Sequence, residues 1–249
     1  MPYELDPWTG SIAPIATYAA EGGRIRTEIS FAPSEAMLIA IRPSRRAADV
    51  HVTGTTADSA VAVDGELAIR ARSDGRYTTT LSDGRTVKTT IAGLPEPVDL
   101  ARWELAVDEY RPGSAGDPSS HTEHVHWRFD DVALTPWSEI PEITDAVGVG
   151  TYTTAVRLPR RWTQRNGAYL ALGALHGSFR VRVNGRSVGV VDQLADEVDI
   201  GPHLRAGTNR IEVEVATTMI NRLRVFRLAG YGSQAKQDYG LIGPVTLTP

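Results

Sequence analysis

The sequence predicts an all-β protein made of two β-sandwich domains. The prediction rests first on short runs in which every second residue is apolar, the period-two pattern of a strand with one buried face. It rests also on the close spacing of these runs and on the lack of any ten-residue helical pattern between them. Many short strands separated by turn residues are typical of a sandwich rather than of an α/β fold.

The clearest single element is a β-hairpin in the second half of the chain. Phe179, Val181 and Val183 alternate with arginines, and Asn184-Gly185 follows directly. Asn-Gly is the dipeptide best suited to a type I′ turn, because both central residues of that turn have positive φ. We therefore predict one strand before this turn and a return strand over Arg186–Val191.

The first 94 residues are predicted to form short strands between Pro, Gly and Asp residues. The expected strands are Pro14–Ala19, Arg24–Phe31, Ala36–Ile41, Asp49–Thr53, Val61–Val63, Glu66–Arg72, Tyr77–Leu81 and Arg85–Thr90. Ser82-Asp83-Gly84 separates the last two, which indicates a hairpin. The run Ala36–Ile41 is apolar throughout, which predicts a strand buried on both faces.

A domain boundary is predicted at Leu94–Pro97, because two prolines confine the backbone there and cannot donate to a sheet. The two predicted domains are residues 1–94 and 95–249. Besides the hairpin, the second domain should contain strands at Ala101–Tyr110, His124–Leu134, Gly150–Leu158, Tyr169–Leu175, Arg210–Thr217 and Leu241–Leu247. Short helical turns are expected at residues 141–145 and 199–204.

Composition restricts the partners of the chain. A net charge of −4 and a pI near 5.9 argue against nucleic acid, since phosphate binding needs a concentrated basic face. No apolar run has the length of a membrane span, so a membrane is not an expected partner either.

The chain has no cysteine, which excludes disulfides and thiolate chemistry. No signal peptide precedes Pro2, and we expect a fragment of a longer polypeptide.

The residues by themselves do not predict a catalytic centre. Glu212 and Glu214 would share one strand face, and glycosidases use two carboxyl groups about 5–10 Å apart. However, these two alternate with apolar residues, as carboxylates on any solvated sheet surface do. Motifs for a serine nucleophile, a phosphate loop or a metal site of standard spacing do not occur. No catalytic residue is therefore predicted.

Two groups of residues offer metal ligands. His124 and His126 would share a strand face beyond His121, but surface histidines without a metal are favoured. Four carboxylates after the hairpin have the oxygen ligands that a structural calcium ion needs, namely Asp192, Asp196, Glu197 and Asp199. Because no ligand loop of defined spacing is present, a plain acidic loop is favoured and no cofactor is predicted.

Four aromatic residues are candidates for contact with carbohydrate: Trp127, Trp137, Tyr231 and Tyr239. Their flat faces suit the C–H faces of sugar rings. The alternative is that they fill the core or rim of the sandwich, which is the more frequent role of such residues. Tyr231 and Tyr239 follow glycine-rich sequence and are the two most expected to be exposed.

Several stretches together resemble the galactose-binding-like β-sandwich, a jelly roll, that is appended to glycoside hydrolases. They are Tyr152–Leu158, Tyr169–Gly185 and Asp199–Val215, closed by Tyr239–Val245. The segment LDPWTG and residues 136–152 are similar to the C-terminal part of large bacterial α-L-rhamnosidases, in which β-sandwiches follow a (β/α)-barrel catalytic domain.

This resemblance implies a non-catalytic accessory module that supports the catalytic domain upstream in the same polypeptide. A glycan is the further partner that it suggests, and the parent protein is expected to be secreted or periplasmic. The barrel that supplies the catalytic acid and base in that family has no counterpart in this sequence, so no catalytic residue is carried over. An autonomous carbohydrate-binding module is the alternative function.

Overall fold

A computed structural model describes residues 1–29, 36–43, 50–63, 65–114, 117, 119–160, 162, 167–227 and 229–249. Within these ranges the regular structure is antiparallel strands, three short 3-10 turns and one α-helix, α1 (Ile220–Val225), which confirms the predicted all-β fold class. No helix within the described residues is long and apolar enough to span a membrane. The chain divides into two units, residues 1–94 and 95–249.

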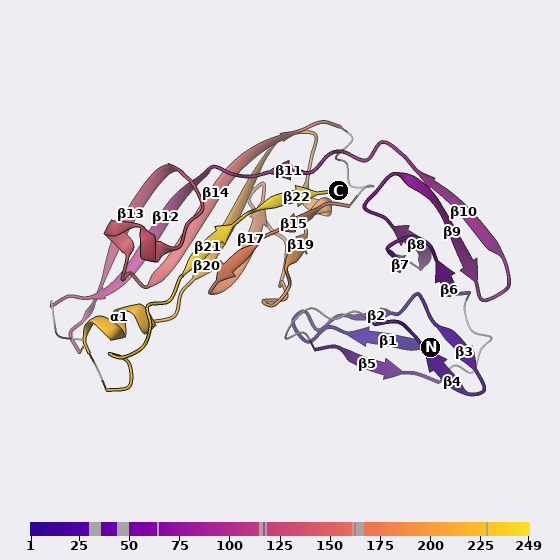
Figure 1. Ribbon diagram of the computed structural model, residues 1–249, viewed down its shortest axis with the longest axis horizontal. Coiled ribbons are helices and arrows are strands. Elements are labelled where there is room, and N and C mark those ends of the chain that lie inside the picture. The colour runs from indigo at the N-terminus through magenta and orange to yellow at the C-terminus, as the bar shows by residue number, and fades with distance from the viewer. Residues whose placement is uncertain are drawn as a thin grey trace. The chain divides into compact units, whose positions relative to one another are not determined.

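The first unit consists of small antiparallel sheets (indigo to magenta in Figure 1). One sheet has the order β2-β1-β5 and contains β1 (Pro2–Leu5), β2 (Ile12–Pro14) and β5 (Leu38–Ile41). A second has the order β10-β9-β6 and contains β6 (Val52–Thr55), β9 (Gly75–Leu81) and β10 (Thr86–Ile91). Two further hairpins pair β3 (Ala19–Glu21) with β4 (Arg24–Arg26), and β7 (Ser59–Val63) with β8 (Glu66–Arg70).

The hairpin predicted around Asp83-Gly84 is confirmed, with Gly84 at a φ of 84°. Other predictions for this unit are wrong. No continuous strand covers Pro14–Ala19, and the strand from Arg24 ends at Arg26. The expected end of that strand at Phe31 lies outside the described residues, and so does Asp49, the first residue of the strand expected over Asp49–Thr53.

The apolar strand β5 is exposed, although its sequence predicted burial on both faces. The exposed fractions of Leu38 and Ile41 are 54% and 65%. Within the described residues β5 is an edge strand that pairs with β1 alone. An unbroken apolar run predicts burial only where both faces of a sheet are covered, and this small sheet does not meet that condition. A complete sandwich in residues 1–94 stays a prediction.

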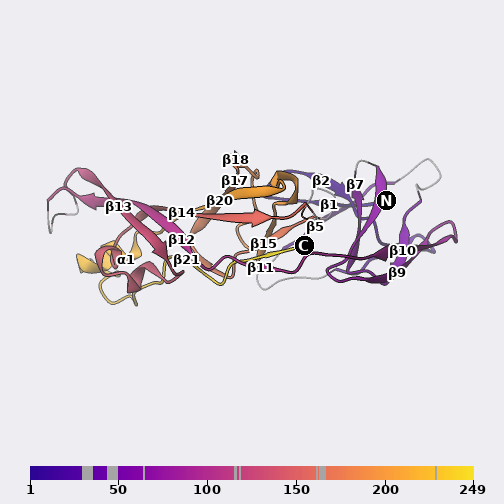
Figure 2. The same cartoon turned by 90° about the horizontal axis from the view of Figure 1, so that it is seen from above.

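The second unit is a jelly-roll-like β-sandwich (Figures 1 and 2). Its larger sheet has the order β13-β12-β14-β20-β17-β18. These strands are β12 (Trp103–Pro112), β13 (Thr122–Val132), β14 (Gly148–Leu158), β17 (Ser178–Val183), β18 (Arg186–Ser187) and β20 (Gly207–Ala216). The smaller sheet has the order β11-β22-β15-β19. It contains β11 (Val98–Asp99), β15 (Tyr169–Ala171), β19 (Glu197–Asp199) and β22 (Thr246–Thr248).

Short elements complete the second unit. A separate strand pair is formed by β16 (Ala174–His176) and β21 (Gly240–Gly243). The 3-10 turns are η1 (Trp137–Glu139), η2 (Pro141–Ile143) and η4 (Gly201–His203). The second and third of these confirm the helical turns expected at residues 141–145 and 199–204.

The central hairpin is confirmed in its turn but not in the length of its return strand. Asn184 and Gly185 have φ values of 54° and 78°, as a type I′ turn requires. The return strand β18 ends at Ser187 rather than at Val191. Beyond it, the side-chain amide of Gln193 bonds the backbone of Phe179, whose N–H donates to Oε1 at 2.7 Å and whose carbonyl accepts from Nε2 at 3.1 Å. The Gln193 side chain therefore makes the two hydrogen bonds at Phe179 that a longer return strand would have made.

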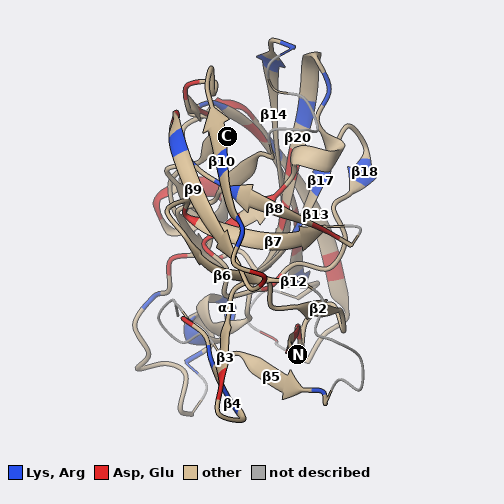
Figure 3. Ribbon diagram, turned by 90° about the vertical axis from the view of Figure 1, so that its right-hand side faces the viewer, with Lys and Arg blue, Asp and Glu red and all other residues tan. Residues whose placement is uncertain are grey.

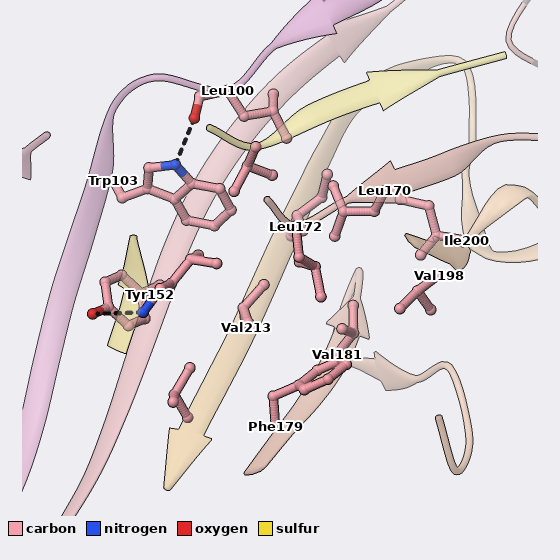
Figure 4. Packing of buried hydrophobic residues seen from close by; sticks show 14 of the residues in the cluster. Leu100, Trp103, Tyr152, Leu170, Leu172, Phe179, Val181, Val198, Ile200 and Val213 are labelled. Atoms are coloured by element: carbon pink, nitrogen blue, oxygen red, sulfur yellow. Dashed lines mark hydrogen bonds between the residues drawn. The ribbon is translucent and has the colours of Figure 1, made fainter. Parts of the chain in front are cut away.

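The hydrophobic core lies between the two sheets of the second unit, as Figure 4 shows. Phe179, Val181 and Val213 of the larger sheet point toward Leu170 and Val198 of the smaller one. Each side chain buried in this way stabilises the fold by about 1.5–3 kcal/mol relative to an exposed one. The polar residues of the same strands lie on the opposite face, so strand periodicity places the core.

Candidate functional site

A pocket of about 250 Å³ is lined by residues of β12, β13 and α1. Figures 1 and 2 show these three elements at the same end of the larger sheet. The charged and aromatic lining of the pocket consists of Glu109, Arg111, Trp127, Glu142, Asp145 and Arg222. The residues come from β12, β13, α1 and the segment around η2. The pocket lies within residues 95–249.

The carboxylate of Glu109 is the centre of this site. Strand periodicity places it there, because Glu109 continues the inward-facing series of β12 that includes Leu105 and Val107. Its exposed fraction is 4%. The Nε1–H of Trp127 donates to Oε2 at 2.8 Å, and the Arg222 guanidinium donates to Oε1. Losing one partner of such a buried ion pair costs about 3–5 kcal/mol.

The helix α1 brings Arg222 to this carboxylate, and its neighbour Asn221 anchors the helix. The Asn221 side chain donates to the carbonyl of Gln237 at 2.7 Å and accepts from the N–H of the same residue at 2.9 Å. The Nε–H of Arg222 is buried and has no hydrogen-bond partner within the described part of the chain. An unsatisfied buried donor costs about 1–3 kcal/mol, so this Nε–H destabilises the folded chain unless an acceptor reaches it.

The structure brings one of the four predicted aromatic residues to the pocket. Trp127 is half-buried and lines it. Tyr231 is 42% exposed in the segment after α1 but is not part of the lining. Carbohydrate contact by these two stays a prediction.

Trp137 and Tyr239 lie in the core instead, which is the alternative role that the sequence allowed. Their exposed fractions are 1% and 2%. The Trp137 Nε1–H donates to the Tyr152 hydroxyl at 2.8 Å, and the Tyr239 hydroxyl lies 2.6 Å from Oγ1 of Thr218. The expectation that Tyr239 is exposed is therefore wrong: its ring is buried, and its hydroxyl bonds the segment that leads into α1.

The histidines do not converge on one point. Nδ1 of His124 and Nδ1 of His126 lie 3.1 and 3.5 Å from the Asp108 carboxylate, whereas His121 approaches Glu123 at 3.6 Å. The described residues contain no group of three His, Asp or Glu side chains that could hold a metal ion.

The carboxylates weighed as calcium ligands take part in local turns. Asp192 accepts a hydrogen bond from the Leu194 N–H at 2.8 Å, and Asp199 accepts one from the Gly201 N–H at 3.0 Å. These bonds explain two of the four acidic residues as turn-forming side chains.

A larger open groove of about 470 Å³ lies on the outer face of the six-stranded sheet, and its charges are paired. Arg102 bonds Asp131, and Arg128 lies 3.3 Å from Glu104. The hydrogen bond from Arg102 lowers the pKa of Asp131, so that this carboxyl stays ionised at neutral pH. A general acid for glycoside cleavage needs a raised pKa instead.

The acidic pair Glu212 and Glu214 is paired with arginines on the same outer face. Arg210 lies 3.1 Å from Glu212, and Arg180 lies 3.7 Å from Glu214. Along the ribbon in Figure 3, basic (blue) and acidic (red) positions alternate with one another rather than forming long runs of one sign. Such exposed pairs contribute about 0–1 kcal/mol each.

Reasoning from sequence missed the charged part of the pocket. Glu109 carried a signal, since it is a charged residue at an inward-facing position of a predicted strand. Arg222 carried none, because 113 residues separate it from Glu109 and only the folded chain joins them.

Residues 90–231 match the family of glycosyl hydrolases family 2, sugar binding domain. The match covers more than half of the chain and includes every lining residue of the pocket. The chain therefore belongs to this family. The match confirms the coarser part of the predicted resemblance, a sugar-binding region of a glycoside hydrolase.

Individual relatives are longer proteins. One from Formosa agariphila, named as a candidate beta-glucuronidase, is 26% identical over 144 residues, which cover 56% of this chain and 11% of that protein. A solved rhamnosidase from Novosphingobium sp. PP1Y is 20% identical with a TM-score of 0.46, over 80% of this chain and 22% of the other. A b-glucuronidase from Ruminococcus gnavus is 17% identical with a TM-score of 0.41, over 63% and 29%. The chain spans less than a third of each of these relatives.

Proposed function

We propose that this chain is a non-catalytic accessory module of an α-L-rhamnosidase-like glycoside hydrolase. In this role it supports the catalytic domain of the same polypeptide and contacts carbohydrate. The observation that carries the proposal is the match of residues 90–231 to a sugar binding domain. The ion pairs in the outer groove support a non-catalytic role, because they engage the carboxylates there with arginines.

Turnover measurements test the non-catalytic role. The purified chain is incubated with an aryl α-L-rhamnoside and, separately, with an aryl β-D-glucuronide. We expect no release of the aryl group above the buffer rate. Hydrolysis that disappears in Asp131→Asn or in Glu142→Gln would contradict the proposal, because it would identify a working carboxylate. The variant Glu214→Gln is the control for a surface carboxylate in an ion pair.

The rhamnosidase assignment rests on the resemblance of the segment LDPWTG and of residues 136–152. A β-glucuronidase parent is the alternative, favoured by the name of the relative from Formosa agariphila. Assaying the polypeptide encoded by the complete reading frame with both aryl glycosides distinguishes the two. Cleavage of the glucuronide alone would contradict the rhamnosidase assignment. Export of the parent to the periplasm or the medium stays a proposal that rests on the resemblance.

An autonomous carbohydrate-binding module is the second candidate function, and the exposed ring of Tyr231 favours it. This function predicts that rhamnose- and galactose-containing glycans bind to the isolated chain with measurable heat in calorimetry. It predicts also that Tyr231→Ala weakens this binding, since stacking on the ring would be lost. Flat titrations with both glycans would eliminate this candidate.

A further inference from the structure

We propose that the pocket beside Glu109 is a subsite for one neutral sugar residue, an inference that rests on the carbohydrate contact in the proposed function. The pocket volume of about 250 Å³ corresponds to roughly eight water molecules at about 30 Å³ each. This space suits a single pyranose ring. Sugar sites combine a few polar groups with an aromatic surface, and this lining offers both.

The first argument is the donor that Arg222 leaves unused. Its guanidinium bonds Glu109 through Nη2, while its buried Nε–H has no acceptor among the described residues. A sugar hydroxyl accepts one hydrogen bond and donates another. One hydroxyl oxygen bound at Arg222 therefore satisfies the Nε–H and passes its own proton on to a second acceptor.

The second argument is that such acceptors are present in the same lining. The carboxylate of Glu142 is exposed, and that of Asp145 pairs with Nζ of Lys236 at 3.0 Å. Guanidinium donors and carboxylate acceptors around one small cavity match neighbouring hydroxyls on a ring, which need both kinds of partner. Trp127 adds an apolar surface whose orientation is held by its bond to Glu109.

The third argument concerns charge and selects a neutral sugar over an acidic one. The lining has three carboxylates, Glu109, Glu142 and Asp145, and two guanidinium groups, Arg111 and Arg222. Glu109 already engages Arg222, Arg111 faces Glu123 at 3.9 Å, and Asp145 pairs with Lys236 at 3.0 Å. Among the described residues, the exposed Glu142 then adds a negative charge that none of these cations pairs with. An anionic ligand would therefore meet an excess of negative charge, whereas a neutral sugar avoids this repulsion.

Titration of the 249-residue chain tests the subsite. The probes are methyl α-L-rhamnopyranoside, methyl β-D-glucopyranoside and, as the acidic counterpart of the latter, methyl β-D-glucuronide. Calorimetry measures affinity, and nuclear magnetic resonance follows the Nε–H signal of Arg222 and the Nε1–H signal of Trp127. We expect at least one neutral glycoside to bind and shift both signals, and the glucuronide to bind at least tenfold more weakly than the glucoside. Equal or tighter binding of the glucuronide would overturn the selectivity for neutral sugars.

Variants separate this subsite from the proposed function. Arg222→Lys keeps a cation for Glu109 but removes the Nε–H. Glu142→Gln removes the charge of an exposed acceptor. Each variant should bind the sugar about tenfold more weakly, while its thermal midpoint changes little. Arg180→Ala, on the outer sheet face, should leave affinity unchanged. Binding that is equal in wild type and in both pocket variants would overturn the subsite yet leave carbohydrate contact standing. No binding of any probe up to saturating concentration would also overturn the subsite, whereas the accessory role depends on the turnover assays.

Discussion

At the scale of single residues, the hydroxyl of Tyr152 joins three elements inside the core. It accepts hydrogen bonds from the Trp137 Nε1–H at 2.8 Å and from the Leu241 N–H at 3.1 Å. Burial raises the pKa of Tyr152 to about 12, although these two hydrogen bonds oppose the shift. The neutral phenol therefore connects β14 with η1 and β21, and Figure 4 shows it beside the apolar core.

Replacing this hydroxyl tests its contribution to stability. Tyr152→Phe should lower the free energy of unfolding by about 2–4 kcal/mol, because two buried N–H donors lose their acceptor. Urea unfolding followed by circular dichroism measures the change. Tyr110→Phe is the control at an exposed ring and should change the free energy by less than about 0.5 kcal/mol. A loss of the same size in both variants would contradict the role of the network.

The pKa of Tyr152 also predicts how stability depends on pH. The folded value of about 12 lies above the ordinary value of 10.0, so the folded protein holds the phenolic proton more tightly than the unfolded chain. The contribution of this difference in pKa to the free energy of unfolding is complete below pH 10. It is lost as pH rises from 10 to about 12, at about 1.4 kcal/mol per pH unit. Tyr152→Phe should lack this part of the decline. Identical slopes for the two proteins across that window would contradict the assignment.

At the scale of elements, the side chain of Asn184 bonds the central hairpin to β20 and to the segment that precedes β20. Its Oδ1 accepts from the Arg210 N–H at 3.1 Å, and its Nδ2 donates to the His203 carbonyl at 3.1 Å and to Oδ1 of Asn209 at 2.9 Å. Asparagine therefore does two things here, since it also tolerates the positive φ of the turn.

Two substitutions separate these roles. Asn184→Gly keeps the backbone conformation but loses three side-chain hydrogen bonds, and should lower the free energy of unfolding by about 2 kcal/mol. Asn184→Ala loses the same bonds and must also adopt a φ of 54°, which adds about 1 kcal/mol. Denaturant unfolding of both variants measures the difference. A more stable alanine variant would show that the turn conformation does not limit stability.

At the scale of the whole molecule, the second unit supplies its own hydrophobic core. Every residue of the main hydrophobic cluster lies between Val98 and Leu247. The two ends of the unit are joined, because β11 pairs with β22 and the Leu100 N–H donates to the Val245 carbonyl at 2.9 Å. The match to the sugar binding family begins at residue 90, close to the start of this unit.

A truncated chain tests this independence. Residues 95–249 alone should unfold in one cooperative thermal transition, because both sheets and the core remain complete. Circular dichroism measures the transition, and the full chain is the control. Removal of residues 244–249 from the truncated chain should abolish the transition, because β22 lies between β11 and β15 in its sheet. A fragment of residues 95–249 without cooperative unfolding would show that the first unit is needed.

Predictions from sequence succeeded where strand periodicity, turn chemistry and burial agree. The alternation of Phe179, Val181 and Val183 placed a buried face, and Asn184-Gly185 placed the turn. They failed where the neighbourhood decides the outcome. The apolar strand β5 is exposed because the faces of its small sheet are not both covered. Tyr239 is buried, and its hydroxyl bonds the segment that leads into α1.

The sequence by itself determined the all-β class, the positions of most strands in the second unit and the resemblance to a sugar-binding sandwich, because these depend on local patterns along the chain. Only the tertiary structure decided where the candidate site lies. Glu109 and Arg222 are far apart in sequence, and the fold brings them together beside Trp127. The physical reason is that a site of this kind depends on packing between elements that are distant in the sequence. Local periodicity predicts which face of one strand is buried, but it does not predict which distant elements pack together.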